Sequence, residues 1–391
     1  MSSNIKVTEL PSQSSYPTRQ KEHHVGNPPT SFKNPWPSFR EYSKWEVFKL
    51  RFGNNPDRNF VPVPQGHDGT RSDELVKVLK PEWGLEQKDR LRATWIGHAS
   101  FLVETAAEPG AERGVRILFD PLFSERTSPV SFFGPKRYTP TPCSLDELPD
   151  VDAICISHDH YDHLDYATII HLYQRRKGRI HFFVGLNVKA WFTQHIGCAS
   201  SEVTELDWWD TRELQVECIG KAQLTCCPTQ HFSGRTGFDA GNTLWCSWAL
   251  KTDKHNLYFA GDTAYQAKDT PSACPIFKEI GEKLGPFDLS LQPIGLYSPP
   301  QISGAVHVTP EQSLEIHKEV KSKLTIGMHY GTVRGGLSMV FEDVRVPPRR
   351  WREAAEKEGI WCGGGVEGDG SKVNVGKEGV GLCHVGETVS I

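Results

Sequence analysis

The sequence predicts an α/β fold, and two observations carry that prediction. Short apolar runs of strand length recur from about residue 91 onward. Longer segments with helical spacing or helix-capping residues separate several of them, which is typical of sheets covered by helices. No apolar run approaches the ~18 residues that a membrane-spanning helix requires, so we expect a soluble or peripheral protein.

The first ninety residues differ from the rest. Residues 1–33 are polar and rich in Ser, Pro, Thr and Lys, so we expect disorder there. Residues 34–90 should form an arm that packs on the core or touches a membrane. Within this arm, Trp45, Phe48 and Phe52 recur at helical spacing beside basic residues. A short helix of this kind either docks on the core or lies on a lipid surface, and both interpretations stay open.

Residues 91–361 contain the regular elements. We expect strands at 94–103, 115–119, 151–156, 180–184, 224–227, 244–250, 256–260, 288–293 and 324–327. We expect helices at 164–173, 276–284 and 349–357, and a further helix that Thr309 caps, with Pro310 first and Gln312 completing a capping box. Residues 362–391 are rich in glycine, and we expect a loose tail.

Charge and cysteine content narrow the class of protein. The formal net charge is -4, with 44 basic against 48 acidic residues, which argues against a nucleic-acid partner. None of the ten cysteines forms a Cys-x-x-Cys pair, and the N-terminus has no apolar signal core. We therefore expect reduced thiols in an intracellular protein, either cytoplasmic or peripheral on an internal membrane.

Three histidines and an aspartate follow the expected strand at 151–156 within six residues. Imidazole and carboxylate together suit zinc, iron or manganese. Four ligands from one turn exceed what one catalytic metal needs while it keeps an open position, so two metals fit better. The four residues are His158, His160, Asp162 and His163.

Other loops must then supply further ligands, and three offer them directly after an apolar strand. His231 follows the strand at 224–227, Asp262 follows 256–260, and His329 follows 324–327. Binding groups on open α/β sheets gather at such strand ends. Gly261 precedes Asp262 and permits a tight backbone turn under it.

Taken in order, these residues resemble the metal motifs of the metallo-β-lactamase superfamily. The resemblance implies an αββα sandwich of two mixed β-sheets flanked by helices, with residues 91–361 as the catalytic domain. It also implies two zinc ions, with iron or manganese as alternatives. The first ion would be held by His158, His160 and His231, the second by Asp162, His163 and His329, and Asp262 would bridge them. An aspartate at position 262, where many β-lactam hydrolases have cysteine, argues against β-lactam hydrolysis.

The flanking segments resemble one branch of that superfamily, the N-acyl-phosphatidylethanolamine phospholipase D family. They are residues 94–100, 134–137, 205–209, 285–289 and 293–295. The resemblance implies a phosphodiesterase that cleaves N-acyl-phosphatidylethanolamine into N-acylethanolamine and phosphatidic acid. A metal-bridging hydroxide would attack phosphorus.

A phospholipid substrate implies peripheral membrane contact, for which Trp45, Phe48 and Phe52 are the candidates. A homodimer is left open. Two alternatives also stay open: a non-lipid hydrolase such as a lactonase or thioesterase, and a metal-binding protein without catalytic activity.

Four further roles are expected near the metals. Asp162 would take part in catalysis as well as in metal binding. Asp120 would accept a hydrogen bond from a metal-bound histidine, or else shape a turn. His307 and His317 lie before and within the helix that Thr309 caps, and either would contact the substrate phosphate or donate a proton to the leaving group. A packed, structural role for His317 is the alternative.

Overall fold

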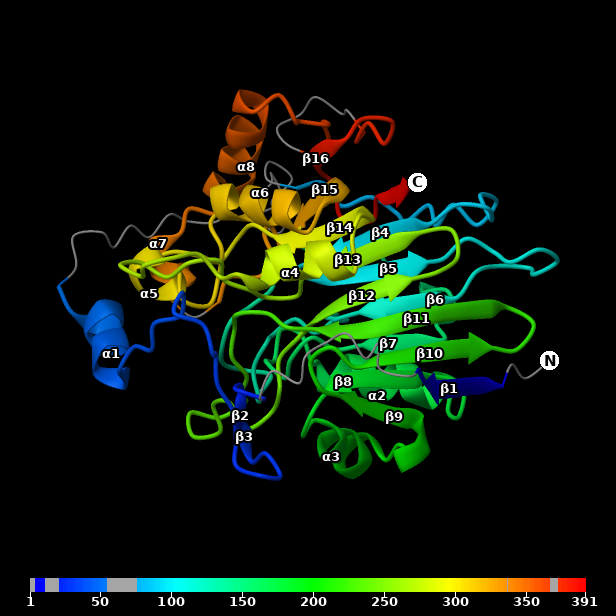
Figure 1. Ribbon diagram of the computed structural model, residues 1–391, viewed down its shortest axis with the longest axis horizontal. Helices are drawn as coiled ribbons and strands as arrows, with labels where there is room; N and C mark the ends of the chain where they lie inside the picture. The colour runs from blue at the N-terminus through cyan, green and yellow to red at the C-terminus, as the bar shows by residue number, and fades with distance from the viewer. Residues whose placement is uncertain (1–3, 11–20, 55–75, 336, 366–371) are drawn as a thin grey trace.

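The computed structural model describes residues 4–10, 21–54, 76–335, 337–365 and 372–391. Two mixed β-sheets lie face to face, and helices cover the outer surface of each (Figure 1). This is the predicted αββα sandwich of two mixed β-sheets flanked by helices, so the predicted fold class is confirmed.

The first sheet has eight strands within the described residues, in the order β1-β10-β11-β12-β13-β14-β15-β16. It is antiparallel from β1 to β13 and parallel from β13 to β16. The strands are Ile5–Glu9 (β1), Thr211–Val216 (β10), Gly220–Cys227 (β11), Ser247–Lys251 (β12), Asn256–Phe259 (β13), Phe287–Pro293 (β14), Ser322–Met328 (β15) and Gly379–Leu382 (β16).

The second sheet has seven strands in the described part of the chain, in the order β17-β4-β5-β6-β7-β8-β9. Its strands are Thr388–Ser390 (β17), Arg92–Gly97 (β4), Ser100–Glu104 (β5), Arg116–Phe119 (β6), Ala153–Cys155 (β7), His181–Gly185 (β8) and Val203–Leu206 (β9). The hairpin strands β4 to β6 are antiparallel, and β6 to β9 are parallel. A small separate ribbon pairs His24–Val25 (β2) with Ser31–Phe32 (β3).

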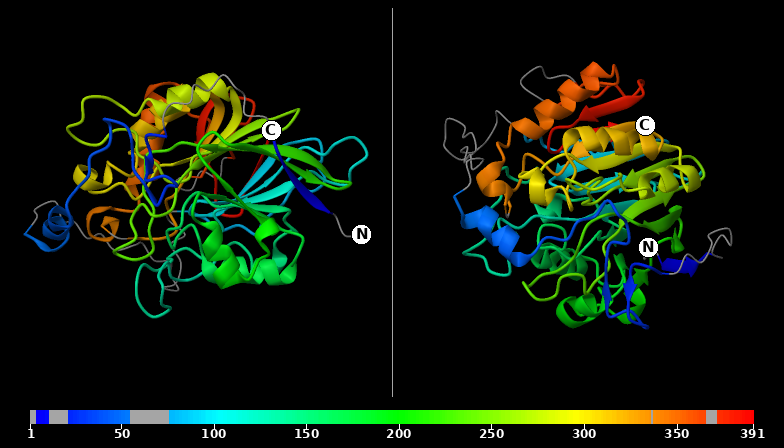
Figure 2. Two further views of the ribbon diagram at one scale, coloured as in Figure 1. Left: turned by 60° about the horizontal axis from the view of Figure 1, so that its bottom comes forward. Right: turned by 60° about the vertical axis from the view of Figure 1, so that its left-hand side comes forward.

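Amphipathic helices close the sandwich on both sides (Figure 2). On the eight-stranded sheet lie α4 (Ile276–Lys283), α6 (Pro310–Glu319) and α8 (Val346–Lys357), and on the seven-stranded sheet lie α2 (Tyr166–Arg175) and α3 (Lys189–Trp191). The predicted capping box of α6 is confirmed, because the Thr309 side chain accepts from the Gln312 backbone N–H. Shorter helices are α1 (Lys44–Phe52), α5 (Pro300–Ser303) and α7 (Ser338–Phe341), with single turns at Leu145–Glu147, Phe192–Ile196 and Ser200–Glu202.

Large aromatic side chains from both sheets fill the space between them. Trp95 and Phe119 come from the seven-stranded sheet, and Trp248 and Phe259 come from the eight-stranded one. The rings of Phe119 and Phe259 lie 4.7 Å apart, so the two sheets touch directly. Burial of such rings is the main source of stability for a two-layer core, and it fixes the strand ends against each other at the sheet edge.

The two ends of the chain differ from the expected disorder. In the N-terminal segment, Ile5–Glu9 pairs with β10 at the sheet edge and His23 is buried. In the tail, β16 joins one sheet and β17 joins the other. The predictions of a disordered start and a loose tail are therefore wrong for the described parts. Backbone pairing with existing strands stabilises these short polar or glycine-rich segments, which their composition does not reveal. Residues 1–3, 11–20 and 366–371 lie outside the described residues.

The predicted helix in the arm is present as α1, but it does not dock on the core. No residue of α1 is buried, and Trp45, Phe48 and Phe52 are 61%, 51% and 62% exposed. In Figure 1 the helix stands away from the sandwich. Of the two interpretations, packing on the core is wrong. Residues 55–75 of the arm lie outside the described part. No helix in the described ranges has both the length and the apolar character to cross a bilayer.

A buried ion pair at the base of the β4–β5 hairpin supplies a stability test. Glu104 pairs with Arg92 at 2.5 Å and with Arg116 at 2.8 Å, and Arg92 is almost fully buried. Glu104→Ala should lower the free energy of unfolding by about 3–5 kcal/mol, because it leaves a buried guanidinium unpaired. Urea denaturation measures this. Glu353→Ala breaks an exposed pair with Arg349 and is the control, with a change of about 0.5 kcal/mol or less. Equal losses in both variants would contradict the assigned role of the Glu104 pair.

Candidate metal centre

The predicted ligands come together at one edge of the sandwich, each from a loop that follows a strand. His158 and His163 lie in the loop after β7, His231 follows β11, Asp262 follows β13, and His329 follows β15. All of these side chains are buried. The tight backbone turn that positions Asp262 requires glycine at position 261. Gly261 has φ +59°, and a Cβ there would lie 2.7 Å from the Cβ of Ser157.

One group consists of three imidazoles, His158, His160 and His231. Their candidate ligand atoms all lie within 4.8 Å of one another. Nδ1 of His160 lies 2.8 Å from Nε2 of His158 and 3.4 Å from Nε2 of His231. Three nitrogens gathered so closely can bind one transition-metal ion and leave a position open.

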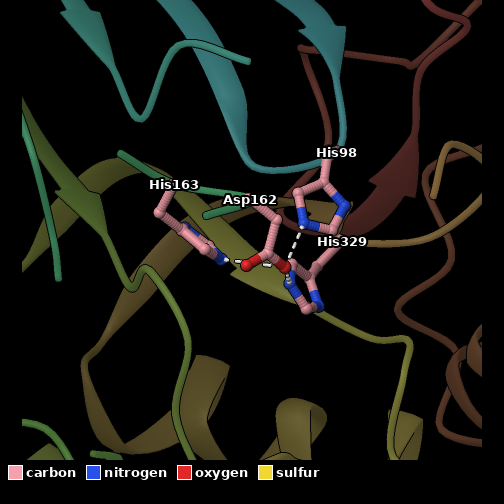
Figure 3. Close-up of side chains that lie close together, drawn as sticks. All are labelled: His98, Asp162, His163 and His329. Atoms are coloured by element: carbon pink, nitrogen blue, oxygen red, sulfur yellow. Dashed lines mark hydrogen bonds and ion pairs between the residues drawn. The ribbon is translucent and has the colours of Figure 1, made fainter. Parts of the chain in front are cut away.

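A second group contains Asp162, His163, His329 and also His98 (Figure 3). Oδ2 of Asp162 lies 3.0 Å from Nε2 of His98, 3.7 Å from Nε2 of His163 and 4.0 Å from Nε2 of His329. The ring of His98 also lies 4.2 Å from that of His329. A carboxylate among several imidazoles is again a set of ligands for a divalent cation.

The carboxylate of Asp262 lies between the two groups. Its Oδ1 is 2.9 Å from Nε2 of His329, and its Oδ2 is 3.2 Å from Nε2 of His163 in the second group. The same Oδ2 is 3.7 Å from Nε2 of His231 and 4.0 Å from Nε2 of His158 in the first group. One buried carboxylate therefore faces both sets of imidazoles at once.

Hydrogen bonds on the far side of the rings set which nitrogen faces the centre. Nδ1 of His163 lies 2.7 Å from Asp120, and Nδ1 of His231 lies 2.7 Å from the carbonyl oxygen of Val306. A proton on Nδ1 satisfies both of these acceptors, which leaves Nε2 as the free lone pair. Asp120 is itself held by the backbone N–H and the hydroxyl of Ser157.

Four buried atoms at the centre lack hydrogen-bond partners among the described residues. They are Nε2 of His163, Nε2 of His329, Nδ1 of His307 and Oδ1 of Asp262. Leaving buried polar atoms unpaired costs about 1–3 kcal/mol each, and four of them converge here. Cations that accept lone pairs from imidazole and carboxylate would satisfy those of His163, His329 and Asp262, so these side chains fit metal ions.

The protonation states of His158, His231 and Asp262 also suit metal binding. Burial lowers the pKa values of His158 and His231 well below the ordinary histidine value, and neighbouring imidazoles add to this effect. Both rings are then neutral, which is the form that binds metal. Burial alone would raise the pKa of Asp262, but His163 and His329 hold it well below its ordinary value. The carboxylate therefore stays ionised.

A comparison with known proteins decides the family. Residues 115–330, more than half of the chain, match the β-lactamase superfamily domain. The chain belongs to the metallo-β-lactamase superfamily. Its fold and its His/Asp clusters are those of a metal-dependent hydrolase of this superfamily.

Relatives with assigned names support the same family. A Caenorhabditis elegans protein named N-acyl-phosphatidylethanolamine-hydrolyzing phospholipase D 1 is 39% identical over 269 residues, which cover 68% of this chain and 71% of that protein. A Saccharomyces cerevisiae protein named N-acyl-phosphatidylethanolamine-hydrolyzing phospholipase D, mitochondrial, is 31% identical over 337 residues, which cover 77% and 67% respectively.

Among solved structures, the isothiocyanate hydrolase from Delia radicum gut bacteria superimposes with a TM-score of 0.51. It is 16% identical and covers 77% of this chain and 98% of that chain. At that identity the likeness shows the fold alone.

Three residues other than the ligands were expected near the metals. Asp120 and His307 lie at the centre, and His317 does not. Asp120 contacts His163, and Nδ1 of His307 lies 3.8 Å from Oδ2 of Asp262. Nδ1 of His317 lies instead 2.7 Å from the hydroxyl of Thr325, where α6 packs on β15. The expectation that His317 contacts substrate is wrong, because its ring is used in helix–sheet packing.

Two other side chains at the centre, those of His98 and Asp159, had no role in the prediction from the sequence. His98 lies at the β4–β5 turn with φ +54° and hydrogen-bonds to Asp162. Asp159, inside the histidine cluster, accepts from the Gly234 backbone N–H and the Thr243 hydroxyl. It thereby ties the loop after His231 to the loop after β7. The segment that contains His98 stood out in the sequence only through its family resemblance.

The close approach at Gly261 gives a test of how the centre is built. Gly261→Ala should destabilise the protein by roughly 1–3 kcal/mol, because its φ is positive and the added Cβ meets Ser157. Thermal unfolding measures the change. Gly237→Ala is the matched control, since a Cβ there meets nothing within 4 Å. A Gly261→Ala variant as stable as Gly237→Ala would contradict the tight packing described here.

Proposed function

We propose that this chain is a binuclear metallohydrolase that cleaves N-acyl-phosphatidylethanolamine into N-acylethanolamine and phosphatidic acid. The observation that carries the proposal is the carboxylate of Asp262 facing two sets of imidazoles. That arrangement suits two metals and therefore phosphodiester chemistry. The names of the nematode and yeast relatives support the choice of lipid.

Zinc is the proposed metal for both positions, because the ligands are imidazoles and carboxylates without a thiolate. His158, His160 and His231 would hold one ion, Asp162, His163 and His329 the other, and Asp262 would touch both. When bound, two such ions lower the pKa of water and offset negative charge on phosphoryl oxygens. Iron or manganese would suit the same ligands.

Asp162 and His307 are among the partly exposed side chains of the centre and so can meet substrate. The side chain of Asp162 is 25% exposed and that of His307 is 19% exposed, whereas those of His163, His329 and Asp262 are at most 2% exposed. Burial alone would raise the pKa of Asp162, but His163 and His98 hold it well below its ordinary value. Ionised Asp162 would orient the attacking water and accept a hydrogen bond from it.

His307 is proposed to contact the phosphate or the leaving oxygen. Burial lowers its pKa to about 4, with neighbouring imidazoles adding to the effect, so the ring is neutral at pH 7 and keeps one N–H donor. In the reaction, the oxygen of water bonds to phosphorus and the bond from phosphorus to the ethanolamine oxygen breaks. The proton lost by water balances the one gained by the leaving alkoxide.

A product assay tests the proposed activity. Purified enzyme is incubated with N-acyl-phosphatidylethanolamine, bis(p-nitrophenyl) phosphate, an acyl-homoserine lactone and an acyl thioester, and products are identified by mass spectrometry. We expect N-acylethanolamine and phosphatidic acid in equal amounts from the lipid. Turnover of only the lactone or the thioester would replace the proposal with the non-lipid hydrolase. No turnover of any substrate by metal-loaded protein would favour a metal-binding protein without catalysis.

Asp262→Asn tests the shared carboxylate. The variant keeps the shape of the side chain but removes the charge that faces both metal positions. We expect kcat to fall by at least ~10²-fold, because several kcal/mol of transition-state stabilisation are lost. Asp253→Asn changes an exposed carboxylate in the turn between β12 and β13, at the other end of β13 from Asp262, and should keep full activity. Near-normal turnover by Asp262→Asn, with circular dichroism unchanged, would contradict the assignment.

Access to a phospholipid requires a surface that meets a membrane, and α1 is the proposed contact. Its three aromatic rings pack on one another, with centroids 5.5 Å apart for Trp45 and Phe48 and 5.0 Å apart for Phe48 and Phe52. Lys49 lies over the Trp45 ring and Arg51 over the Phe52 ring. Exposed aromatics beside basic groups are typical of helices that lie in the headgroup region of anionic membranes.

The aromatic surface of α1 extends toward the metal centre. Lys44 donates to the carbonyl oxygen of Gly237 at 3.0 Å and lies over the ring of Phe238, which is 94% exposed. Within the same loop, the ring of Phe232 packs at 4.6 Å from that of His160. A membrane that contacts α1 would therefore lie next to the loop that follows His231.

Paired variants test this membrane contact. Trp45→Ala with Phe48→Ala removes apolar surface, and Lys44→Glu with Lys49→Glu reverses charge. We expect binding to anionic liposomes and hydrolysis in vesicles to fall by at least ~10-fold, because each buried ring contributes about 1.5–3 kcal/mol. Hydrolysis of a short-chain soluble phosphodiester should persist.

Leu85→Ala is the control, because Leu85 is also exposed but lies outside α1. If the α1 variants lose activity on both substrates and melt earlier, the helix is structural and the membrane-facing surface lies elsewhere.

A further inference from the structure

A second cluster of ligand-type side chains lies apart from the loops that form the metal centre. His23 directly precedes β2 of the small ribbon, His24 is the first residue of β2, and Asp207 follows β9. Their candidate ligand atoms all lie within 4.8 Å of one another. The cluster joins the N-terminal segment to the seven-stranded sheet and has no part in the proposed reaction.

The three side chains meet at short distances. Nε2 of His23 lies 2.8 Å from Oδ1 of Asp207, and Nε2 of His24 lies 2.9 Å from Oδ2. The ring of His23 is fixed because it stacks on Trp208 at 4.1 Å. The side chains of His23, His24 and Asp207 are 9–10% exposed, so water reaches them little.

The contact between His24 and Asp207 is not a hydrogen bond, although the distance would allow one. Nε2 of His24 is buried and has no hydrogen-bond partner among the described residues. Its ring therefore does not aim at the oxygen along the line that a hydrogen bond requires. Nε2 of His163 and Nε2 of His329 are in the same situation beside Asp262. Within the cluster this holds for His24 alone, because Nε2 of His23 is in hydrogen-bond contact with Oδ1 of Asp207 at 2.8 Å, a contact that an ion would replace.

We propose that His23, His24 and Asp207 form a structural site for a divalent transition-metal ion, with zinc as the best match. Two imidazoles and one carboxylate supply three ligands, and water completes the tetrahedron. Asp207 supplies both carboxylate oxygens to the cluster, one beside each histidine.

The site would fasten the segment that supports the catalytic centre. Beyond the ribbon, Asn34 donates to the carbonyl oxygen of His231 at 2.7 Å, and Ser38 donates to the side chain of Gln230 at 2.6 Å. Trp36 of the same segment stacks on Trp208 at 5.3 Å. An ion that links His23 and His24 to Asp207 would hold this segment against the sheet, and so would hold the loop around His231.

Lys21 is the group that competes with an ion. Its Nζ lies 3.1 Å from Oδ2 of Asp207, and its side chain is 66% exposed. A lysine so exposed can turn into solvent, or it can keep a hydrogen bond to the second lone pair of the oxygen while an ion binds. Its positive charge weakens cation binding, so its removal should strengthen the site.

Metal content of the full-length protein tests the proposal. Protein saturated with zinc and desalted is measured by elemental analysis. We expect wild type to hold one ion per chain more than His24→Gln and Asp207→Asn. His255→Gln, which alters a histidine outside both clusters, should match wild type. This difference does not depend on how many ions the catalytic centre holds or on whether the lipid is the substrate.

Lys21→Ala gives a second measurement that needs no loss of a ligand. In competition with a chelator it should retain the additional ion about tenfold more tightly, because one positive charge is removed near a divalent cation. Equal metal content in wild type, His24→Gln and Asp207→Asn would overturn the proposal, and the cluster would be an ion pair. An unchanged affinity in Lys21→Ala would also overturn it, because the ion would then lie elsewhere.

Discussion

A single buried carboxylate surrounded by imidazoles is the constraint on which the rest of the centre depends. Asp262 lies within 4.0 Å of nitrogen atoms from His158, His163, His231 and His329. Without cations, several of these atoms stay unpaired inside the protein, at a cost to the free energy of folding. With two cations, the same atoms become ligands. Metal binding and stability of this sheet edge are therefore linked.

The backbone at this edge carries strain that the packed sheets support. His98, Asp120 and His329 all have positive φ angles, of 54°, 40° and 63°, although none is glycine. Each such residue costs roughly 1–3 kcal/mol and persists only where surrounding structure over-determines it. Here the sandwich core supplies that support. At these positions the side chains of His98, Asp120 and His329 reach Asp162, His163 and Asp262 respectively.

The sequence predicted the core of the fold well because apolar strands and capped helices are local signals. The strand at 151–156 and the helix that Thr309 caps appear at the expected places as β7 and α6. The strands β1, β9, β10, β16 and β17 were missed. All except β10 are edge strands, whose stability comes from pairing with a neighbouring strand rather than from their own composition.

At the metal centre, too, the sequence showed the local patterns but not the long-range contacts. The close spacing of the histidines from His158 to His163 indicated metal, and strand ends indicated His231, Asp262 and His329. No local pattern could show that His317 packs against Thr325, that His98 reaches Asp162, or that His23 and His24 meet Asp207. Each of these contacts joins residues from different elements or loops of the fold. Only the assembled sheets bring them together or keep them apart.

Anomalous X-ray scattering at the zinc edge, from crystals of the zinc-loaded protein, tests the central claim most directly. Two peaks about 3.5–4 Å apart are expected at the sheet edge. One should lie among His158, His160 and His231 and the other among Asp162, His163 and His329, with Asp262 between them. A single peak at this edge in fully active protein, or two peaks that Asp262 does not touch, would contradict the account.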